Sequence, residues 1–163
     1  MIRRVTADDG GRARALRIEM LADSPLAFIT TLADVAVAPH AEFIERCAKG
    51  ATGDQQAHYV AQVGKRLVAQ AIGIVTPGAV DRTLLVGVYI SPAYRGRGIL
   101  GGLVDEVAAW SRECGRDALD LEVVCGNQRA IRAYTRLGFS PIGQPVIHPT
   151  IPELREQRMT RAA

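Results

Sequence analysis

The segment Tyr94–Gly102, YRGRGILGG, contains glycines whose spacing is suited to binding phosphate. Gly96, Gly98 and Gly101 satisfy G-x-G-x-x-G just before a predicted helix. Glycine lets a phosphate approach the backbone closely, and the unpaired N–H groups and dipole of a helix N-terminus attract anions. The sequence therefore predicts a pyrophosphate site, for a dinucleotide or for coenzyme A, with a ligand-free glycine turn as the alternative.

The surroundings of these glycines argue against NAD or FAD. A dinucleotide loop follows its strand directly, and an acidic residue about 20 positions later binds the ribose. Asp120 and Glu122 lie in that range, but the five residues SPAYR separate Ile90, at the end of the strand, from Gly96. Only about 40 residues follow Glu122, too few for the further repeats of a doubly wound sheet. No G-K-[ST] follows the loop, which excludes a P-loop.

Hydrophobic periodicity divides the chain into helical and extended segments. The three central strands should be antiparallel, because they follow one another through short turns. From the N-terminus, the pattern predicts a strand at 2–6, a helix at 12–21, a loop, a helix at 39–49, strands at 57–63, 67–76 and 81–91, a helix at 99–114, a strand at 118–124, a helix from 127 that ends at Gly138, and two strands in the tail. The helix at 99–114 carries an apolar stripe of Ile99, Leu103, Val107 and Trp110.

Two segments resemble the GNAT superfamily of N-acetyltransferases. In ISPAYRGRGILG, Arg95 and Gly98 fit the first and fourth positions of the family's acetyl-CoA signature, [QR]-x-x-G-x-[GA]. Leu100 departs from it, because the family has Gly or Ala at the sixth position. Residues 121–139, LEVVCGNQRAIRAYTRLGF, are similar to the next family block, an L-E-V strand followed by N-x-x-A-x-x-x-Y and G-F. The order of predicted elements fits the family over nearly the whole chain.

The resemblance implies a mixed α/β fold, a single GNAT-type domain over residues 1–163 with a central, mostly antiparallel sheet flanked by helices. The strands at 81–91 and 118–124 would form a parallel pair that splays apart, and Gly87 agrees with a distorted strand. The pantetheine arm of acetyl-CoA would lie along the first of these strands. The residues implied in binding it are Val88, Tyr89 and Ile90 for pantetheine and Arg95, Gly96, Arg97, Gly98, Ile99, Leu100 and Gly101 for the pyrophosphate.

The predicted helix after residue 127 carries further candidates. Asn127 is a preferred N-cap residue, and the resemblance adds a contact with the cofactor. Tyr134 lies seven residues later on the same helical face. By resemblance it is the general acid that protonates the departing thiolate, and its alternative role is that of a half-buried core aromatic. The basic stripe Arg129, Arg132 and Arg136 is expected to face solvent, with contact to the 3′-phosphate of coenzyme A as its alternative.

A base is needed if the acceptor amine is protonated at rest. Deprotonation at pH 7 costs about 4.6 kcal/mol for a lysine-like amine and about 1 kcal/mol for an α-amino group. Glu122 resembles the base glutamate of family members with the same L-E-V strand. The alternatives for Glu122 are an exposed strand carboxylate or a partner for a nearby arginine, and some family members use a water chain or another residue as the base. His148 could line the acceptor pocket, although a loop histidine beside prolines is more often a surface residue.

The predicted function is transfer of an acetyl group from acetyl-CoA, as co-substrate, to an amine-bearing acceptor by direct attack. Cys125 is the only cysteine near the predicted site and lacks an identifiable activating base, which favours direct attack. The rival function is a non-catalytic acyl-CoA-binding or regulatory domain, which would need neither Glu122 nor Tyr134.

Composition narrows the range of partners and surroundings. The 20 basic and 17 acidic residues are spread along the chain and aromatic residues are only 5%, so we expect no nucleic acid partner. The cysteine spacing encodes neither disulfides nor a metal site. The polar N-terminus and the absence of long apolar runs predict a cytoplasmic protein without a membrane partner. A homodimer is left open.

Overall fold

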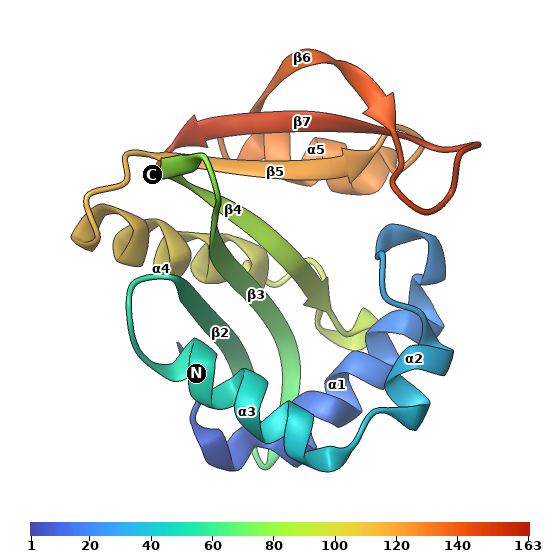
Figure 1. The fold of residues 1–163 in the computed structure, drawn as a ribbon, viewed down its shortest axis with the longest axis vertical. Coiled ribbons are helices and arrows are strands. Elements are labelled where there is room, and N and C mark those ends of the chain that lie inside the picture. Colours follow the sequence, from blue (N-terminus) through green and yellow to red (C-terminus); the bar gives the residue numbers. More distant parts are fainter.

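The computed structural model describes residues 1–163, which form a seven-stranded sheet in the order β1-β2-β3-β4-β5-β7-β6 (Figure 1). All neighbouring strands are antiparallel except β4 and β5, which are parallel. This confirms the predicted mixed α/β fold with a mostly antiparallel sheet. The strands are β1 Ile2–Arg4, β2 Gln56–Val63, β3 Arg66–Thr76, β4 Ala79–Ile90, β5 Ala118–Val124, β6 Ser140–Ile147 and β7 Arg155–Ala162.

The helices are α1 Gly10–Asp23, α2 Leu32–Val37, α3 His40–Ala51, α4 Ile99–Glu113 and α5 Gln128–Arg136, with 3-10 turns η1 Ala7–Asp9, η2 Pro25–Ala27 and η3 Pro92–Tyr94. Helix α2 lies where the sequence predicts a loop. Thr31 and Asp34 form a capping box, in which each side chain accepts a hydrogen bond from the other's backbone N–H, so this short helix has a local start signal. None of the helices has the length and apolar character needed to span a membrane.

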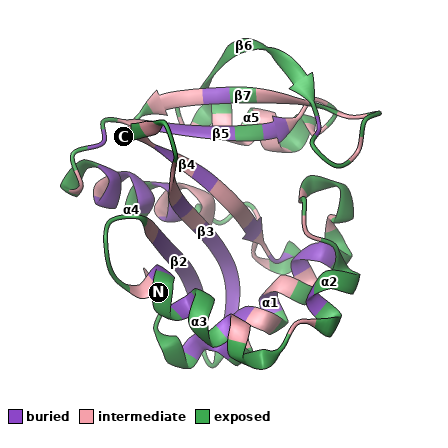
Figure 2. Cartoon of the chain, in the orientation of Figure 1, coloured by how far each residue is buried: buried purple, intermediate pink, exposed green.

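Two hydrophobic cores lie on opposite faces of the sheet, and buried residues follow both (Figure 2). In the larger core, Leu103, Val107 and Trp110 of the predicted α4 stripe pack against the sheet. The smaller core joins α1 and α3 to β2 and β3 through Leu16, Met20, Phe43, Cys47, Val60 and Leu67. Strand β5 alternates, with Leu119, Leu121 and Val123 facing the larger core. Its even-numbered residues therefore point to the α1 side of the sheet.

Strands β4 and β5 pair only from Arg82 with Ala118 to Leu85 with Leu121, so β4 continues beyond Leu85 without a partner on that side. The divergence coincides with a β-bulge, because Ile72 pairs with Val86 but Gln70 pairs with Tyr89. Gly87 lies in the bulge with φ +59°, a conformation that favours glycine. The splayed parallel pair expected from the sequence is therefore present.

Candidate functional site

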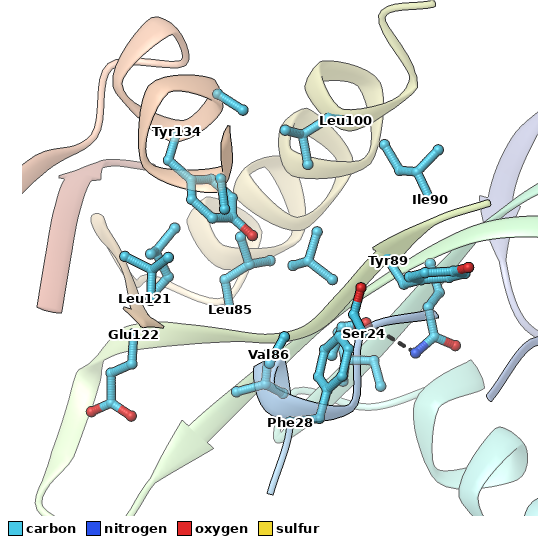
Figure 3. Close-up of a pocket in the computed structure, with 18 of the residues that line it drawn as sticks. Ser24, Phe28, Leu85, Val86, Tyr89, Ile90, Leu100, Leu121, Glu122 and Tyr134 are labelled. Carbon is cyan, nitrogen blue, oxygen red and sulfur yellow. Dashed lines mark hydrogen bonds between the residues drawn. The ribbon is translucent and has the colours of Figure 1, made fainter. Parts of the chain in front are cut away.

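A groove of about 960 Å³ opens where β4 leaves β5. Its lining residues run from the loop before α4, past the end of β4, to α5, the end of β5 and the start of β7. Figure 3 shows part of this lining, including Ile90, Leu100, Glu122 and Tyr134. All but one of the predicted site residues line it: Val88, Tyr89, Ile90, Arg95, Gly96, Gly98, Ile99, Leu100, Gly101, Glu122, Asn127 and Tyr134. The exception is Arg97, whose guanidinium lies over the ring of Tyr94, 5.4 Å from its centroid.

The glycine loop presents free backbone donors at the N-terminus of α4. Gly96 and Gly98 have φ of +75° and +77°, and a Cβ at either position would meet no atom within 4 Å. Gly98 is the N-cap residue, and no side chain caps the helix. The N–H groups of residues 96–98 donate no hydrogen bond within the protein, and those of the first turn, residues 99–101, lack intrahelical partners. This cluster of donors can bind a polyanion.

Arg95 positions this loop with its side chain. Its Nε donates to the carbonyl of Ile90 at 3.0 Å, and its Nη2 pairs with the carboxylate of Asp23 on α1. Leu100 packs against the larger core, while its backbone lies in the first turn of α4. A leucine is therefore accommodated at the position where the family signature has Gly or Ala.

The unpaired stretch of β4 forms one wall of the groove. Val88 and Ile90 pack their side chains against the larger core, whereas Tyr89 is buried on the opposite face. The Tyr89 hydroxyl donates to Glu19 at 3.4 Å, and burial raises its pKa to about 12. On the side facing β5, the backbone beyond Leu85 has no strand partner and can pair with an extended ligand.

Helix α5 contributes an amide and a hydroxyl. Asn127 caps the helix, its Oδ1 accepting from the N–H of Ala130 at 3.1 Å, as expected for an N-cap. The half-buried ring of Tyr134 packs edge-to-face on Phe139 at 5.7 Å. Its hydroxyl points into the groove and makes no hydrogen bond within the protein (Figure 3). Burial raises the pKa of Tyr134 above its ordinary value, so the hydroxyl remains protonated at neutral pH.

The carboxylate of Glu122 is exposed and directed away from Tyr134 (Figure 3). It faces the α1 side of the sheet, opposite Arg158 and beside Glu156 on β7. Burial raises the pKa of Glu156 above its usual range, and the charge of Glu122 adds to this effect. His148 is buried rather than at the surface and lies behind Glu156, with its Nε2 3.6 Å from Glu156 Oε1.

The basic stripe of Arg129, Arg132 and Arg136 is exposed, as expected from the sequence, and it also lines the groove. Two further groove-lining arginines were not predicted from the sequence. Arg17 of α1 and Arg46 of α3 also line it. Arg17 falls on the helical face of the buried Ala13, Leu16 and Met20, a spacing that the sequence shows and that marks it as an unusual core-facing charge.

His58 and Cys47 are buried side chains at the same groove. Burial lowers the pKa of His58 to about 4, so its imidazole is neutral at pH 7. Burial raises the pKa of the Cys47 thiol to about 11. Cys47, not Cys125, is the cysteine that lines the groove, because α3 packs over the sheet here. This corrects the expectation that only Cys125 lies near the site.

Residues 21–139 match the model of the acetyltransferase (GNAT) family. The chain is also 39% identical over 63 residues to streptothricin acetyltransferase from Streptomyces lavendulae. The aligned part is 39% of this chain and 33% of that protein, so the chain spans about a third of the length of this relative.

Solved structures share the fold over nearly the whole chain. Ribosomal-protein-alanine N-acetyltransferase from Brucella melitensis has a TM-score of 0.78 and 22% identity, covering 100% of this chain and 99% of its own. The yncA protein from Salmonella typhimurium, solved with its cofactor acetyl-CoA, has a TM-score of 0.80 and 17% identity, covering 99% and 92%. These similarities show the fold in which the groove is built.

Proposed function

Because the chain belongs to the GNAT family of acetyltransferases, we propose that it transfers an acetyl group from acetyl-CoA to a primary amine by direct attack in a ternary complex. One observation carries the proposal. The uncapped N-terminus of α4, the unpaired stretch of β4 and the free hydroxyl of Tyr134 all line one continuous groove. They supply an anion site, an extended backbone edge and a proton donor.

The groove suits the parts of coenzyme A in order along its length. The free N–H groups at residues 96–101 fit a pyrophosphate, because they combine unpaired donors with the positive end of the helix dipole. The edge of β4 at residues 86–90 fits the amide groups of pantetheine. Arg129, Arg132 and Arg136 add positive charge for a further phosphate. When bound, acetyl-CoA supplies the activated thioester.

The reaction involves two proton transfers, one to the departing sulfur and one from the amine. A C–N bond forms as the amine attacks the thioester carbonyl, and the C–S bond breaks. Tyr134 would donate its phenolic proton to the departing sulfur. Glu122 would remove a proton from the amine, directly or through water. Its carboxylate is exposed on the other side of β5 from Tyr134, so an amine or a water molecule can reach it from that side.

The state of the cysteines supports direct attack over a covalent intermediate. Cys47 lines the groove, but burial raises its pKa to about 11, so its thiol is protonated and weakly nucleophilic at neutral pH. Cys125 does not line the groove. No cysteine of the chain is therefore placed as an activated nucleophile.

Two measurements test the proposed function. Calorimetry should show binding of acetyl-CoA at one site per chain and no tight binding of NAD. A panel of amines should then include acceptors that cause acetyl-CoA-dependent thiol release. Tight binding of NAD without binding of coenzyme A would contradict the proposal. Binding of acetyl-CoA without release for any amine would favour a non-catalytic acyl-CoA-binding domain.

A further inference from the structure

Arg17 is a groove-lining cation without a counterion inside the protein. Its neighbours Leu16 and Met20 on α1 are buried, and its own Nε is buried without a hydrogen-bond partner. The one hydrogen-bond contact of its guanidinium is weak, from Nη1 to the sulfur of Met20 at 3.8 Å. The guanidinium also lies over the ring of Phe28, 5.8 Å from the centroid. No carboxylate lies within ion-pair distance of Arg17.

The two carboxylates nearest to Arg17 along α1 are already engaged. Glu19 pairs with Arg66 at 2.5 Å, and Asp23 pairs with Arg95. Burial, with a further contribution from the nearby cation Arg46, lowers the pKa of Arg17 to about 10. Arg17 is therefore still charged at neutral pH. Removing a charged group from water without giving it a counterion is unfavourable in free energy. An anion bound beside Arg17 would therefore offset this desolvation free energy.

Arg17 lies at the point where the groove opens between the strands. Its Nη1 is 3.9 Å from the position that a Cβ would take at Gly87. The last β4 residue paired with β5 is Leu85, and Gly87 follows it by two residues. Because two residues of a strand span about 7 Å, Gly87 lies about that distance beyond the point where the two strands separate. Glu122 directly follows Leu121, the partner of Leu85, and points to the α1 side of the sheet. A cation and a carboxylate thus flank the divergence on one face.

On the same face, the carboxylate of Glu156 lies close to the buried side chain of His148. Glu156 lies beside Glu122, and both line the groove. His148 is only 2% exposed, and its Nδ1 accepts from the N–H groups of Thr150 and Ile151 at 3.2 and 3.1 Å. A ring whose Nδ1 accepts these hydrogen bonds has its proton on Nε2. That nitrogen lacks a hydrogen-bond partner and lies 3.6 Å from Glu156, where it opposes part of the rise in the Glu156 pKa that burial causes.

We propose that the acceptor is an amine that also carries a carboxylate, as a free amino acid does. Arg17 binds the carboxylate, and Glu122 with Glu156 attracts the ammonium group towards the divergence of β4 and β5. Arginine suits the first task, because its planar donors can hold a carboxylate through two parallel hydrogen bonds. This substrate class deepens the proposed function and rests on it. A peptide N-terminus lacks the adjacent carboxylate, and a polycationic amine would be repelled by Arg17.

The decisive comparison is between common L-amino acids and their C-terminal amides, which differ at the carboxylate. With wild-type protein and saturating acetyl-CoA, kcat/KM should be at least about tenfold higher for an accepted amino acid than for its amide. Arg17→Met keeps an unbranched apolar stem and removes the charge. It should raise KM for the amino acid at least about tenfold, bring the acid-to-amide ratio close to one, and leave KM for acetyl-CoA unchanged.

Arg14→Met is the matched control, because Arg14 lies one turn earlier on α1 and does not line the groove. It should preserve the ratio of kcat/KM for the amino acid to kcat/KM for its amide. Equal loss of this ratio in Arg14→Met and Arg17→Met would indicate a general disturbance of α1 and contradict the inference.

Calorimetry with the same ligands, on protein saturated with coenzyme A, gives a readout independent of catalysis. Acid-selective binding without turnover would support the inference and contradict the proposed function. Equal use of acids and amides by the wild type would overturn the inference and leave the proposed function intact.

Discussion

Tyr134 combines a packing role and a free hydroxyl in one side chain. Its ring contacts Phe139, whereas its oxygen faces the groove. Tyr134→Phe removes only that oxygen, so the thermal midpoint and acetyl-CoA affinity should change little while kcat falls about 100-fold. Higher pH should not restore the rate, because no other group replaces the lost donor. Tyr94→Phe, outside the groove, is the control. An unchanged kcat in Tyr134→Phe would make this tyrosine a core aromatic only.

Glu122 should show the opposite response to pH. If it accepts the proton of the amine, Glu122→Gln should lower kcat/KM most at neutral pH, where an acceptor amine with a pKa above 7 is mostly protonated. The fraction of free amine grows about tenfold with each pH unit below that pKa, so the variant should recover part of its rate towards pH 9. The measurement is a pH–rate profile, with Glu153→Gln as an exposed control. Parallel profiles for Glu122→Gln and wild type would assign the base to another group.

Residue patterns predicted the groove lining near α4 and α5 better than the lining contributed by α1. Arg95, Gly98, Asn127 and Tyr134 stand in two contiguous motifs, and short motifs carry their own spacing information. Arg17 stands in no motif. Its position on the buried stripe of α1 is visible in the sequence, but the fact that its charge lies beside Gly87 depends on how α1 packs against the sheet.

The loop at the N-terminus of α4 keeps its backbone conformation because Gly96 and Gly98 both have positive φ. Gly98→Ala adds a methyl group at φ +77°, a conformation that an L side chain rarely adopts, and so strains the loop that presents the free N–H groups. We expect acetyl-CoA affinity to fall at least about tenfold. Gly78→Ala is the matched control, because Gly78 has φ +82°, equally open surroundings and a position in the β3–β4 turn. Calorimetry on both variants should show loss of affinity only in Gly98→Ala, and equal losses would place the phosphate site elsewhere.

Most elements could be predicted because local periodicity is strong. Strand β5 has the predicted bounds, 118–124, since the alternation of Leu119, Leu121 and Val123 is unbroken. Helix α2 was missed because its six residues include two valines and no long amphipathic stripe, so its capping box was the only signal. Pro39 is the N-cap residue of α3 rather than part of its first turn.

The order of the strands in the sheet cannot be predicted from local sequence patterns, because it depends on which distant strands pair. Strand β7 inserts between β5 and β6, which places Glu156 beside Glu122 and His148 behind it. Nothing in the spacing of these three residues indicates that they meet, because their contact follows from strand pairing. The resemblance to a family predicted the splayed pair and the overall architecture, whereas the charged face opposite α4 emerges only from the assembled sheet.

Acid stability of the whole fold should depend on Asp9, which joins β1 to α1. Its carboxylate accepts from Arg3 at 2.7 and 2.9 Å and from the Thr6 N–H at 2.9 Å. The hydrogen bonds from Arg3 are the main cause that lowers the pKa of Asp9 to about 2, against the opposing effect of burial. A lowered folded-state pKa stabilises the fold above the unfolded pKa near 3.9, and this stabilisation is lost as pH falls towards 2.

Asp9→Asn should therefore lower the free energy of unfolding by about 2 kcal/mol at pH 7, the scale of a shift of nearly two pKa units. The difference from wild type should shrink between pH 4 and pH 2, because protonation removes the same charge from the wild-type side chain. Urea unfolding at a series of pH values measures both effects. Asp8→Asn, at the exposed neighbouring position, should follow the wild-type curve. A destabilisation by Asp9→Asn that stays constant down to pH 2 would show that the carboxylate acts through shape rather than charge.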